Sequence, residues 1–499
     1  MPFQRQAWQA YLAGQSGLIQ VPTGSGKTYA AVMGPIAAML AEGCGTGAAG
    51  SVHGPGAAPE PPDLDRAPCT PAVRQAMAET RPGPTGCVTA DGTPSAVRRA
   101  RRRSSTTLGP GEPEGLRLLV ITPLRALSRD LALAIEEPIR EMGWPLRVVI
   151  RNGDTPSHER SRQLRRPPQI LVTTPESLSV LLSNAAAPEL FARLQAVVLD
   201  EWHELMGSKR GVQCELGLSW LRRLRPDLRS WAISATIGNL EEAARAALGL
   251  DASEPLTAEN GFGTPGSDPD RIAPSARLIN ARLQRDTTIR SLLPESIDGF
   301  PWGGHLGLRM YEELVAGLDP TVSTLLFTNT RNQAERWHQC LRFACPEMED
   351  ALALHHSAID RAEREAIEAR VKAGELRWVV CTSSLDLGVD FQPVERVVQI
   401  GSAKNLARLL QRAGRSAHCP GGTSQVLFMP TNALELLEVS AMRRGLQEGL
   451  VEHRRPPQLP LDVLLQHLTS LACGPGLHPE QGLETVRSCW SFRQLTDAQ

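Results

Sequence analysis

Val21-Pro22-Thr23-Gly24-Ser25-Gly26-Lys27-Thr28 lies between a short apolar run and a segment rich in Ala, Met and Leu. The apolar run, residues 18–21, predicts a buried strand, and the segment 29–41 predicts a helix. A strand, a glycine turn and a helix that carries Gly-Lys-Thr form the sequence pattern of a phosphate-binding P-loop. The strict pattern has Gly where Val21 stands, so this stretch fits the relaxed form of the motif.

The residue types of this loop suit the binding of ATP and Mg²⁺. Its glycines let backbone N–H groups curl around phosphate oxygens, and the N-terminus of the next helix adds partial positive charge. Lys27 is expected to reach the β- and γ-phosphates, and the Thr28 hydroxyl to hold Mg²⁺. The remaining phosphate contacts are expected from the loop residues Thr23, Gly24, Ser25 and Gly26.

Composition limits the classes of protein to which the chain can belong. Its 499 residues are enough for two or three domains, and a formal net charge of −1 means that nucleic acid would bind only to local basic patches. No run of about eighteen apolar residues occurs, so no membrane span is expected. The ten cysteines are scattered without a C-x-x-C pair, which indicates a reducing compartment.

Two blocks of alternating strands and helices follow one another along the chain. Such alternation, with continuous apolar strands, predicts an α/β fold in which helices cover both faces of a parallel sheet in each block. We expect a first domain over residues 1–250, a linker rich in Pro, Gly, Asp and Ser over 251–275, and a second domain over 276–455. The expected strands are 118–121, 148–150, 170–172, 196–199 and 231–234, then 324–327, 378–382, 397–400 and 426–429.

The segment from about 43 to 115 differs from both blocks. Gly, Ala, Pro, Ser and Arg dominate it, and apolar periodicity is almost absent. Such a segment cannot bury enough surface to offset its ordering entropy, so a disordered insertion in a surface loop is expected. Its basic run, residues 98–103, is open to three interpretations: solvated filler, which we favour, a tether for nucleic acid, or a nuclear-import signal.

Two adjacent acids, Asp200 and Glu201, follow the strand expected at 196–199. A carboxylate at this end of a parallel strand points into the ligand crevice of the sheet. Asp200 is expected to hold Mg²⁺, and Glu201 to orient or deprotonate the attacking water. After the next strand, the hydroxyls of Ser234 and Thr236 either relay the state of these acids or cap the following helix.

In the second block, Gln411-Arg412-Ala413-Gly414-Arg415 places two arginines three residues apart. On a helix this spacing puts both side chains on one face. Two planar guanidinium groups that face a phosphate crevice are what an arginine finger needs. The alternative is a basic helix face without a ligand.

Four further strand ends offer hydroxyls and backbone N–H groups, two of them next to an arginine. This chemistry grips a sugar-phosphate backbone without reading bases. One such turn is an ordinary strand-to-helix connection, but four in two tandem domains predict a path for nucleic acid. The residues concerned are Thr122, Pro123, Arg125, Thr173, Thr174, Thr328, Asn329, Arg331, Thr382 and Ser383.

Taken together, these stretches resemble the ordered motif set of the superfamily 2 helicases over about residues 3–430. Asp200-Glu201-Trp202-His203 resembles motif II in its DExH form, and the stretch from Gln411 to Arg415 resembles motif VI. Two further stretches, Arg151-Asn152-Gly153-Asp154-Thr155 and Leu354-His355-His356-Ser357, resemble the Lhr (large helicase-related) family. Within it, Asp200-Glu201-Trp202-His203 followed by Gly207-Ser208-Lys209-Arg210-Gly211 is similar to the branch called ligase-associated DExH-box helicases.

The resemblance implies two RecA-like domains that bind ATP and Mg²⁺ between them, followed at 456–499 by the start of a winged helix. It also implies further site residues: Gln4 for the adenine, Gly388 and Asp390 of motif V for the nucleotide, Gln411 for catalysis, and Arg151 and Asp154 for nucleic acid. The implied activity is ATP-driven 3′-to-5′ movement on single-stranded DNA in DNA repair.

The implied partners are single-stranded DNA or a tailed duplex, and repair proteins such as a ligase or nuclease. A monomer is expected, in the bacterial cytoplasm and nucleoid, or in the nucleus or an organelle of a eukaryote. Two alternatives stay open, an RNA helicase and a non-catalytic scaffold, whereas a nuclease would need a further carboxylate cluster. The apolar spacing in 461–471 predicts the first helix of a truncated winged helix, in a partial chain, with exposed apolar surface.

Overall fold

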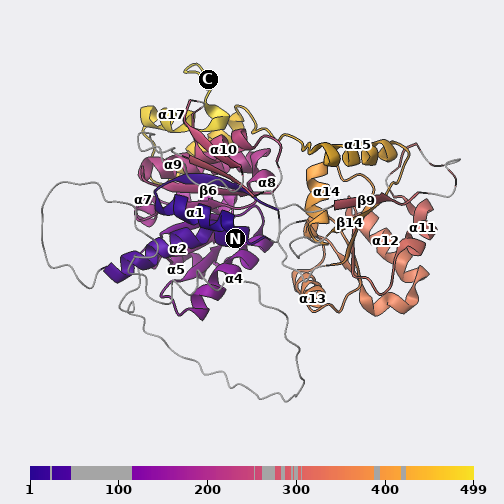
Figure 1. Cartoon of the computed structure of the whole chain (residues 1–499). Helices are drawn as coiled ribbons and strands as arrows, with labels where there is room; N and C mark the ends of the chain where they lie inside the picture. The colour runs from indigo at the N-terminus through magenta and orange to yellow at the C-terminus, as the bar shows by residue number, and fades with distance from the viewer. Residues whose placement is uncertain are drawn as a thin grey trace, which may run out of the picture.

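Two α/β domains follow one another along the chain, and a helical C-terminal segment packs against the first of them (Figure 1). The computed structural model describes residues 1–22, 25–45, 115–235, 237–251, 253–260, 276–281, 287–293, 296, 300, 302–304, 306–386, 394–416 and 423–499. None of the helices within these ranges combines the length and the apolar character that crossing a bilayer requires.

The first sheet is parallel throughout, as the alternation of elements predicts. Among the described residues it has eight strands in the order β3-β4-β2-β5-β6-β1-β8-β7. All residues of β2, β4 and β5 are buried, which explains their unbroken apolar sequences. The strands are β1 (Ser16–Gln20), β2 (Leu118–Ile121), β3 (Val148–Arg151), β4 (Ile170–Thr173), β5 (Ala196–Leu199), β6 (Arg229–Ser234), β7 (Leu256–Asn260) and β8 (Ala276–Asn280).

Successive side chains of these strands enter two different hydrophobic cores, one on each face of the sheet. In β2, Leu119 and Ile121 join one core, whereas Leu118 and Val120 join the other. The second core packs against α1 (Pro2–Leu12), α2 (Lys27–Gly45) and α4 (Arg125–Glu141). The first packs against α6 (Pro175–Leu182), α7 (Ala187–Phe191), α8 (Trp202–Met206), α9 (Lys209–Leu224) and α10 (Leu240–Leu248), while α5 (Ser157–Arg165) is mostly exposed.

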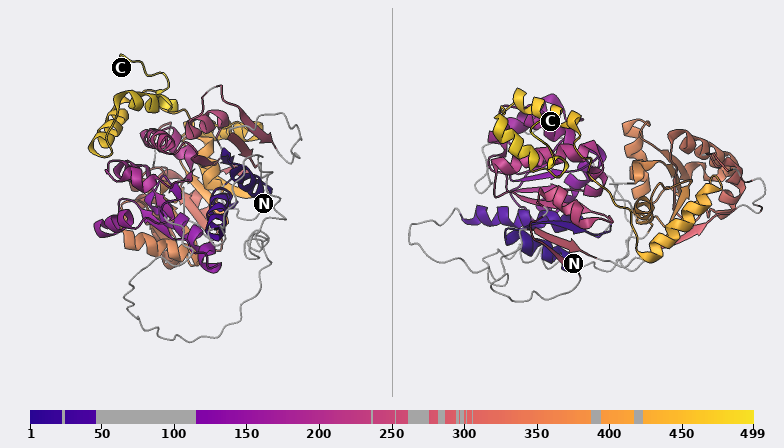
Figure 2. Two further views of the ribbon diagram at one scale, coloured as in Figure 1. Left: turned by 90° about the vertical axis from the view of Figure 1, so that its left-hand side faces the viewer. Right: turned by 90° about the horizontal axis from the view of Figure 1, so that it is seen from above.

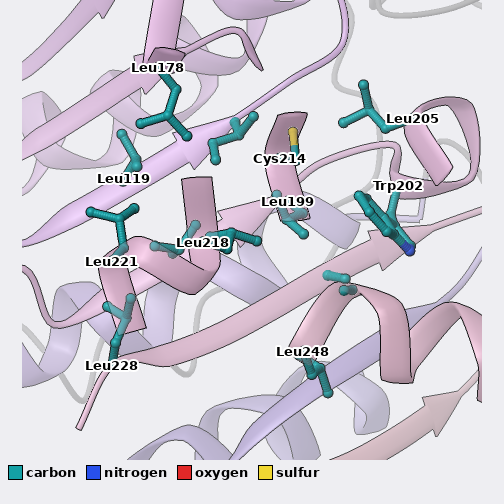
Figure 3. Close-up of a cluster of buried hydrophobic side chains, with 14 of the residues drawn as sticks. Leu119, Leu178, Leu199, Trp202, Leu205, Cys214, Leu218, Leu221, Leu228 and Leu248 are labelled. Atoms are coloured by element: carbon teal, nitrogen blue, oxygen red, sulfur yellow. The ribbon is translucent and has the colours of Figure 1, made fainter. Parts of the chain in front are cut away.

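Figure 3 shows part of the first core, in which leucines of the sheet face α6, α8 and α9. Trp202 is fully buried there, and its indole N–H donates to the carbonyl of Ala243 at 2.9 Å. This bond satisfies the one polar atom of the side chain and ties α8 to α10. The segment after the Asp200-Glu201 pair is therefore fixed by packing.

The second domain repeats the architecture with six strands among the described residues, all parallel, in the order β11-β12-β10-β13-β14-β9. The strands are β9 (Thr287–Ser291), β10 (Thr324–Phe327), β11 (Leu352–His355), β12 (Trp378–Cys381), β13 (Arg396–Ile400) and β14 (Ser424–Met429). Its helices are α11 (Tyr311–Gly317), α12 (Arg331–Ala344), α13 (Arg361–Lys372), α14 (Leu406–Ala413) and α15 (Leu434–Glu448). In both sheets most of the predicted motifs lie at the carboxyl ends of strands, whereas Gln411 and Arg412 lie on α14.

The C-terminal segment comprises α16 (Leu461–Cys473), α17 (Pro479–Arg487) and the short 3₁₀ turn Trp490–Phe492. It returns to the first domain and lies over α9, as the view from above in Figure 2 also shows. Its apolar side chains form a small core with Val212 and Leu216 of α9.

The expectation of exposed apolar surface in this segment is therefore largely wrong. Val463, Leu464 and Leu471 are buried, and only Leu461 and Leu465 of α16 remain 46% and 68% exposed. The reason is that α9 supplies the apolar partner, so the segment does not need a core of its own. Sequence spacing shows that a helix face is apolar, but not which element covers it.

Two predictions about connecting segments have different outcomes. β7 lies inside the predicted linker 251–275 and pairs with β8, so the first sheet continues beyond residue 250. This edge strand was missed because its sequence, Leu-Thr-Ala-Glu-Asn, lacks an apolar run. The predicted insertion lies outside the described residues from 46 to 114, and α2 extends to Gly45.

Candidate ATP and nucleic-acid sites

The P-loop follows β1 and leads into α2, as its sequence predicts. Gly26 has φ +75°, a conformation in which a Cβ would also come within 2.8 Å of Gln4 Nε2. That amide nitrogen donates to the Gly26 carbonyl at 3.0 Å, so Gln4 lies against the loop that it is expected to serve. The Ser25 hydroxyl donates to the Pro22 carbonyl, whereas the predicted residues Thr23 and Gly24 lie outside the described residues.

Lys27 and Glu201 form an ion pair at the carboxyl edge of the sheet. Glu201 follows β5 and adopts left-handed backbone angles, φ 48° and ψ 45°, a strained conformation for a residue with a side chain. Burial by itself would raise the pKa of Glu201, but the charge of Lys27 above all holds it below its ordinary value. Glu201 is therefore a carboxylate, the form that can accept a proton from water.

Asp200 lies next to this pair in a different electrostatic setting. Burial raises its pKa to about 6, an effect that Lys27 opposes and the charge of Glu201 reinforces. Its Oδ1 is buried and has no hydrogen-bond partner among the described residues. An unpartnered carboxylate oxygen beside the phosphate loop fits a hard cation such as Mg²⁺, with Thr28 as the second protein group.

The DExH histidine joins the two domains. Its Nδ1 accepts a hydrogen bond from the Ala235 backbone N–H at 3.1 Å, and its Nε2 lies 2.5 Å from Nε2 of Gln411 on α14. Burial lowers the pKa of His203, so the ring is neutral and carries its proton on Nε2. A donor on Nε2 of His203 needs an acceptor on α14, and a 180° rotation of the Gln411 amide would bring its oxygen to that position.

The predicted relay by the Ser234 and Thr236 hydroxyls takes another form. Ser234 Oγ is buried without a hydrogen-bond partner in the described part of the chain, and Thr236 lies outside it. The backbone N–H of Ala235 makes the contact to His203 instead. The hydrogen bond between this turn and the DExH histidine thus comes from the main chain, which a search for hydroxyl side chains does not find.

The two arginines of the second domain have separate roles, and the expectation that Arg412 faces the phosphates is wrong. Its guanidinium group donates twice to Asp386, Nε to Oδ1 at 2.7 Å and Nη2 to Oδ2 at 3.0 Å, and also donates to Gln399. It lies 4.7 Å from the centroid of the Phe327 ring and is 2% exposed. Arg412 therefore holds α14 to the sheet and to the strand-end turn after β12.

Arg415 remains the candidate arginine finger. Its Nη2 donates to the Asp386 carbonyl at 3.0 Å, and its charge contributes to the low pKa of Glu201 in the other domain. The guanidinium group is therefore within electrostatic reach of Glu201, the acid that pairs with Lys27 of the P-loop. The motif V residues Gly388 and Asp390, expected beside the nucleotide, lie outside the described residues.

A groove of about 930 Å³ runs between the two domains. Both domains supply basic and hydroxyl side chains to its walls, as a path for nucleic acid requires. Of the predicted contact residues, the structure brings seven to this groove: Pro123, Arg125, Arg151, Asp154, Thr174, Thr382 and Ser383. Asp154 is paired with Arg125 at 2.8 Å, so it positions an arginine and offers no donor to phosphate.

The other predicted contacts do not line this groove. Thr122, Thr173 and Thr328 are fully buried; Thr173 Oγ1 donates to the Arg151 carbonyl and Thr328 Oγ1 to the Cys381 carbonyl. The hydroxyls of Thr173 and Thr328 thus serve the ends of the sheets, whereas Thr122 Oγ1 is buried without a hydrogen-bond partner among the described residues. Asn329 and Arg331 are exposed at the start of α12, and Arg331 reaches the groove through Ser357, to whose Oγ it donates at 2.8 Å.

Several groove residues were missed by the motif search. Five of them lie on helices and not at strand ends: Arg129, Arg160, Arg210, Arg361 and Arg364. The sixth, Ser357, is in the turn that follows β11. Asp386 and Gln399 were missed as well, since only the fold brings them to Arg412. The three arginines within 361–370, Arg361, Arg364 and Arg370, were the available signal for the α13 wall.

Comparison with known proteins gives three family matches along the chain. They are a DEAD/DEAH box helicase domain at residues 1–243, a helicase conserved C-terminal domain at 309–419, and the winged helix domain of large helicase-related proteins at 444–499. The chain belongs to the Lhr family of superfamily 2 helicases. Its two α/β domains are thus the paired RecA-like domains of this family, followed by winged-helix sequence.

Individual Lhr relatives agree with this family. The chain is 33% identical over 392 residues to "ATP-dependent helicase Lhr-Core protein 2" of Thermococcus barophilus, an alignment that covers 76% of this chain and 43% of that protein. It is 31% identical over 422 residues to "Lhr helicase/uracil glycosylase" of Escherichia coli, covering 76% and 27%. The chain thus spans less than half the length of these curated relatives.

Among solved structures, that of Mycobacterium smegmatis helicase Lhr bound to ssDNA and AMP-PNP superposes with a TM-score of 0.72. The superposition covers 100% of this chain and 54% of that one at 24% identity, which supports the shared fold.

Proposed function

We propose that this chain is an ATP-driven motor that moves 3′-to-5′ along single-stranded DNA, working as a monomer in DNA repair. The observation that carries the proposal is a single interface between two RecA-like domains. This interface contains the P-loop with the neighbouring acids Asp200 and Glu201, and also a groove lined by Arg and Thr side chains. The name "ATP-dependent helicase" among the Lhr-Core relatives, and the DNA-bound Lhr structure, support it.

Binding of ATP would rearrange the Lys27–Glu201 pair. Lys27 would exchange the carboxylate for the β- and γ-phosphates, which releases Glu201 to orient the attacking water. A Mg²⁺ ion held by Thr28 and Asp200 would neutralise the phosphate charge. Arg415, already within reach of Glu201, would stabilise the charge that develops on the γ-phosphate.

His203 and Gln411 provide the link between hydrolysis and domain movement. Their contact joins the acid-bearing segment of one domain to the arginine-bearing helix of the other, and Arg454 donates to the His203 carbonyl at 2.6 Å on the same side. Closure of the interface on ATP would strengthen this contact, and loss of phosphate would weaken it. The groove walls would then move with each turnover and step the strand.

The polynucleotide is the first point to test. ATP hydrolysis by the purified chain is measured with matched DNA and RNA oligonucleotides of one sequence. Stimulation by DNA supports the proposal, and stimulation by RNA alone supports the RNA helicase alternative. No stimulation by either would leave the non-catalytic scaffold as the better description.

Polarity is measured separately by displacement of streptavidin from oligonucleotides with biotin at one end. Movement from 3′ to 5′ displaces it from the 5′ end, and displacement from the 3′ end alone would refute the proposed direction. We also propose a repair role in the nucleoid or nucleus, with a ligase or nuclease as partner. This role predicts that the partner enzyme joins or trims DNA strands faster when the motor is present.

A further inference from the structure

Arg210, at the start of α9, connects the two turns that form the first-domain wall of the groove. Its Nη2 donates to the Pro123 carbonyl, in the turn that follows β2. Its Nε and Nη2 donate to Oε1 and Oε2 of Glu176, in the first turn of α6 just after β4, the second bond at 3.2 Å. All three residues line the groove, and the ion pair is half-exposed to it.

The partner carboxylate is out of place in a groove for a polyanion. Glu176 is in the first turn of α6, beside the hydroxyl-bearing residues Thr174 and Ser177 that face the same space. A lone carboxylate here would repel a phosphate held by those groups, since like charges a few ångströms apart interact strongly at a half-exposed site. Arg210 covers this charge with a two-pronged contact that a lysine cannot reproduce.

The other side of α9 carries the C-terminal segment. Lys209, next in sequence to Arg210, pairs with Asp462 of α16 at 2.5 Å, and Gln213 one turn later bonds Gln466 at 3.1 Å. Within this first part of α9, Arg210 faces the groove, whereas Lys209 and Gln213 contact the C-terminal segment. Figure 1 shows α9 next to α17 of that segment. Lys209 therefore offers a control that shares the helix but not the groove.

We infer that Arg210 is a positioning residue for single-stranded DNA: it sets the spacing of the Pro123 and Glu176 turns and cancels the Glu176 charge where a phosphate passes. This role rests on the proposed function, because it concerns the same groove. Arg210 acts on the strand through Glu176 and the turn after β2, and takes no part in ATP chemistry.

The test compares R210Q, E176Q, the double variant R210Q/E176Q, R210K and K209A with the parent chain. Binding of a fluorescein-labelled single-stranded DNA is measured by anisotropy, and ATP hydrolysis is titrated with the same DNA. R210Q is expected to weaken binding about tenfold, the effect of one uncovered charge near a phosphate. Its apparent KM for DNA should rise equally, while kcat at saturating DNA and the melting temperature stay close to the parent values.

The double variant separates charge from structure. If the uncovered Glu176 carboxylate causes the defect, R210Q/E176Q recovers most of the lost affinity, R210K is intermediate, and K209A binds like the parent. Parent-like binding by R210Q, or a double variant as weak as R210Q, would overturn the inference. If the parent chain binds no single-stranded DNA, both the proposed function and this role of Arg210 are refuted. That outcome is seen with the parent chain alone, so it is distinct from a failure of the variants.

Discussion

Replacement of Glu215 by Gln should remove the loss of stability that its deprotonation causes where the C-terminal segment packs on α9. Glu215 is in the middle of α9, 1% exposed, beneath the 3₁₀ turn of the C-terminal segment. Its carboxylate accepts hydrogen bonds from Ser491 N at 2.9 Å and from Ser491 Oγ at 3.0 Å. Burial raises its pKa to about 7, although Ser491 and, more weakly, Arg222 and Arg493 favour the charged form.

The sign and size of the effect follow from proton linkage. The folded protein holds the Glu215 proton up to about pH 7, while the unfolded chain loses it near the ordinary value of 4.5. Between these values the folded state binds more protons, so the free energy of unfolding falls as pH rises. The total loss above pH 7 is about 3 kcal/mol, taken from roughly 1.4 kcal/mol per pKa unit.

The Gln side chain copies the protonated acid, because its oxygen accepts from Ser491 N–H and its NH₂ group donates to Ser491 Oγ. We therefore expect E215Q to match the parent near pH 5 and to exceed its stability by up to about 3 kcal/mol at pH 8. Urea unfolding at both pH values measures this difference, with D462N as the control because Asp462 is an exposed acid of the same interface. A pH dependence in E215Q equal to that of the parent would refute the argument.

Three further predictions concern the ATP site. Lys27→Ala should abolish most binding of a fluorescent ATP analogue. Glu201→Gln should keep this binding and lose turnover by about 10²-fold or more, because only the group acting on water is changed. Near-parent turnover of Glu201→Gln would contradict the assignment of Glu201 to the attacking water. Arg412→Ala should lower the melting temperature, because it leaves the buried Asp386 carboxylate without its partner at a cost of about 3–5 kcal/mol. Arg415→Ala should melt like the parent and lose DNA-stimulated hydrolysis by about 10³-fold. The reverse pattern of melting and hydrolysis would exchange the roles of the two arginines. Gln411→Ala should keep basal ATP hydrolysis but lose its stimulation by DNA, and unchanged stimulation would show that the His203 contact is not the link.

Much of the fold was predictable because the signals are contiguous in the chain. The apolar strands at 118–121 and 196–199 and the glycine turn at Gly26 report backbone conformation directly, and their order indicates a parallel sheet. The strand ends then identify the catalytic edge, so Lys27 and Glu201 could be assigned to one ATP site although 174 positions separate them. Edge strands such as β7 and β9 were not predictable, because their sequences are half polar and only pairing makes them strands.

The partners of charged side chains depend on tertiary structure. Two arginines three residues apart look equivalent in the sequence, yet Arg412 is buried against Asp386 and Arg415 lies toward the other domain. The Arg210–Glu176 pair and the Glu215–Ser491 contact join segments that no local pattern relates. The physical reason is that helix and strand periodicity are encoded by near neighbours, whereas an ion pair forms only where packing brings two distant groups together and removes water from them.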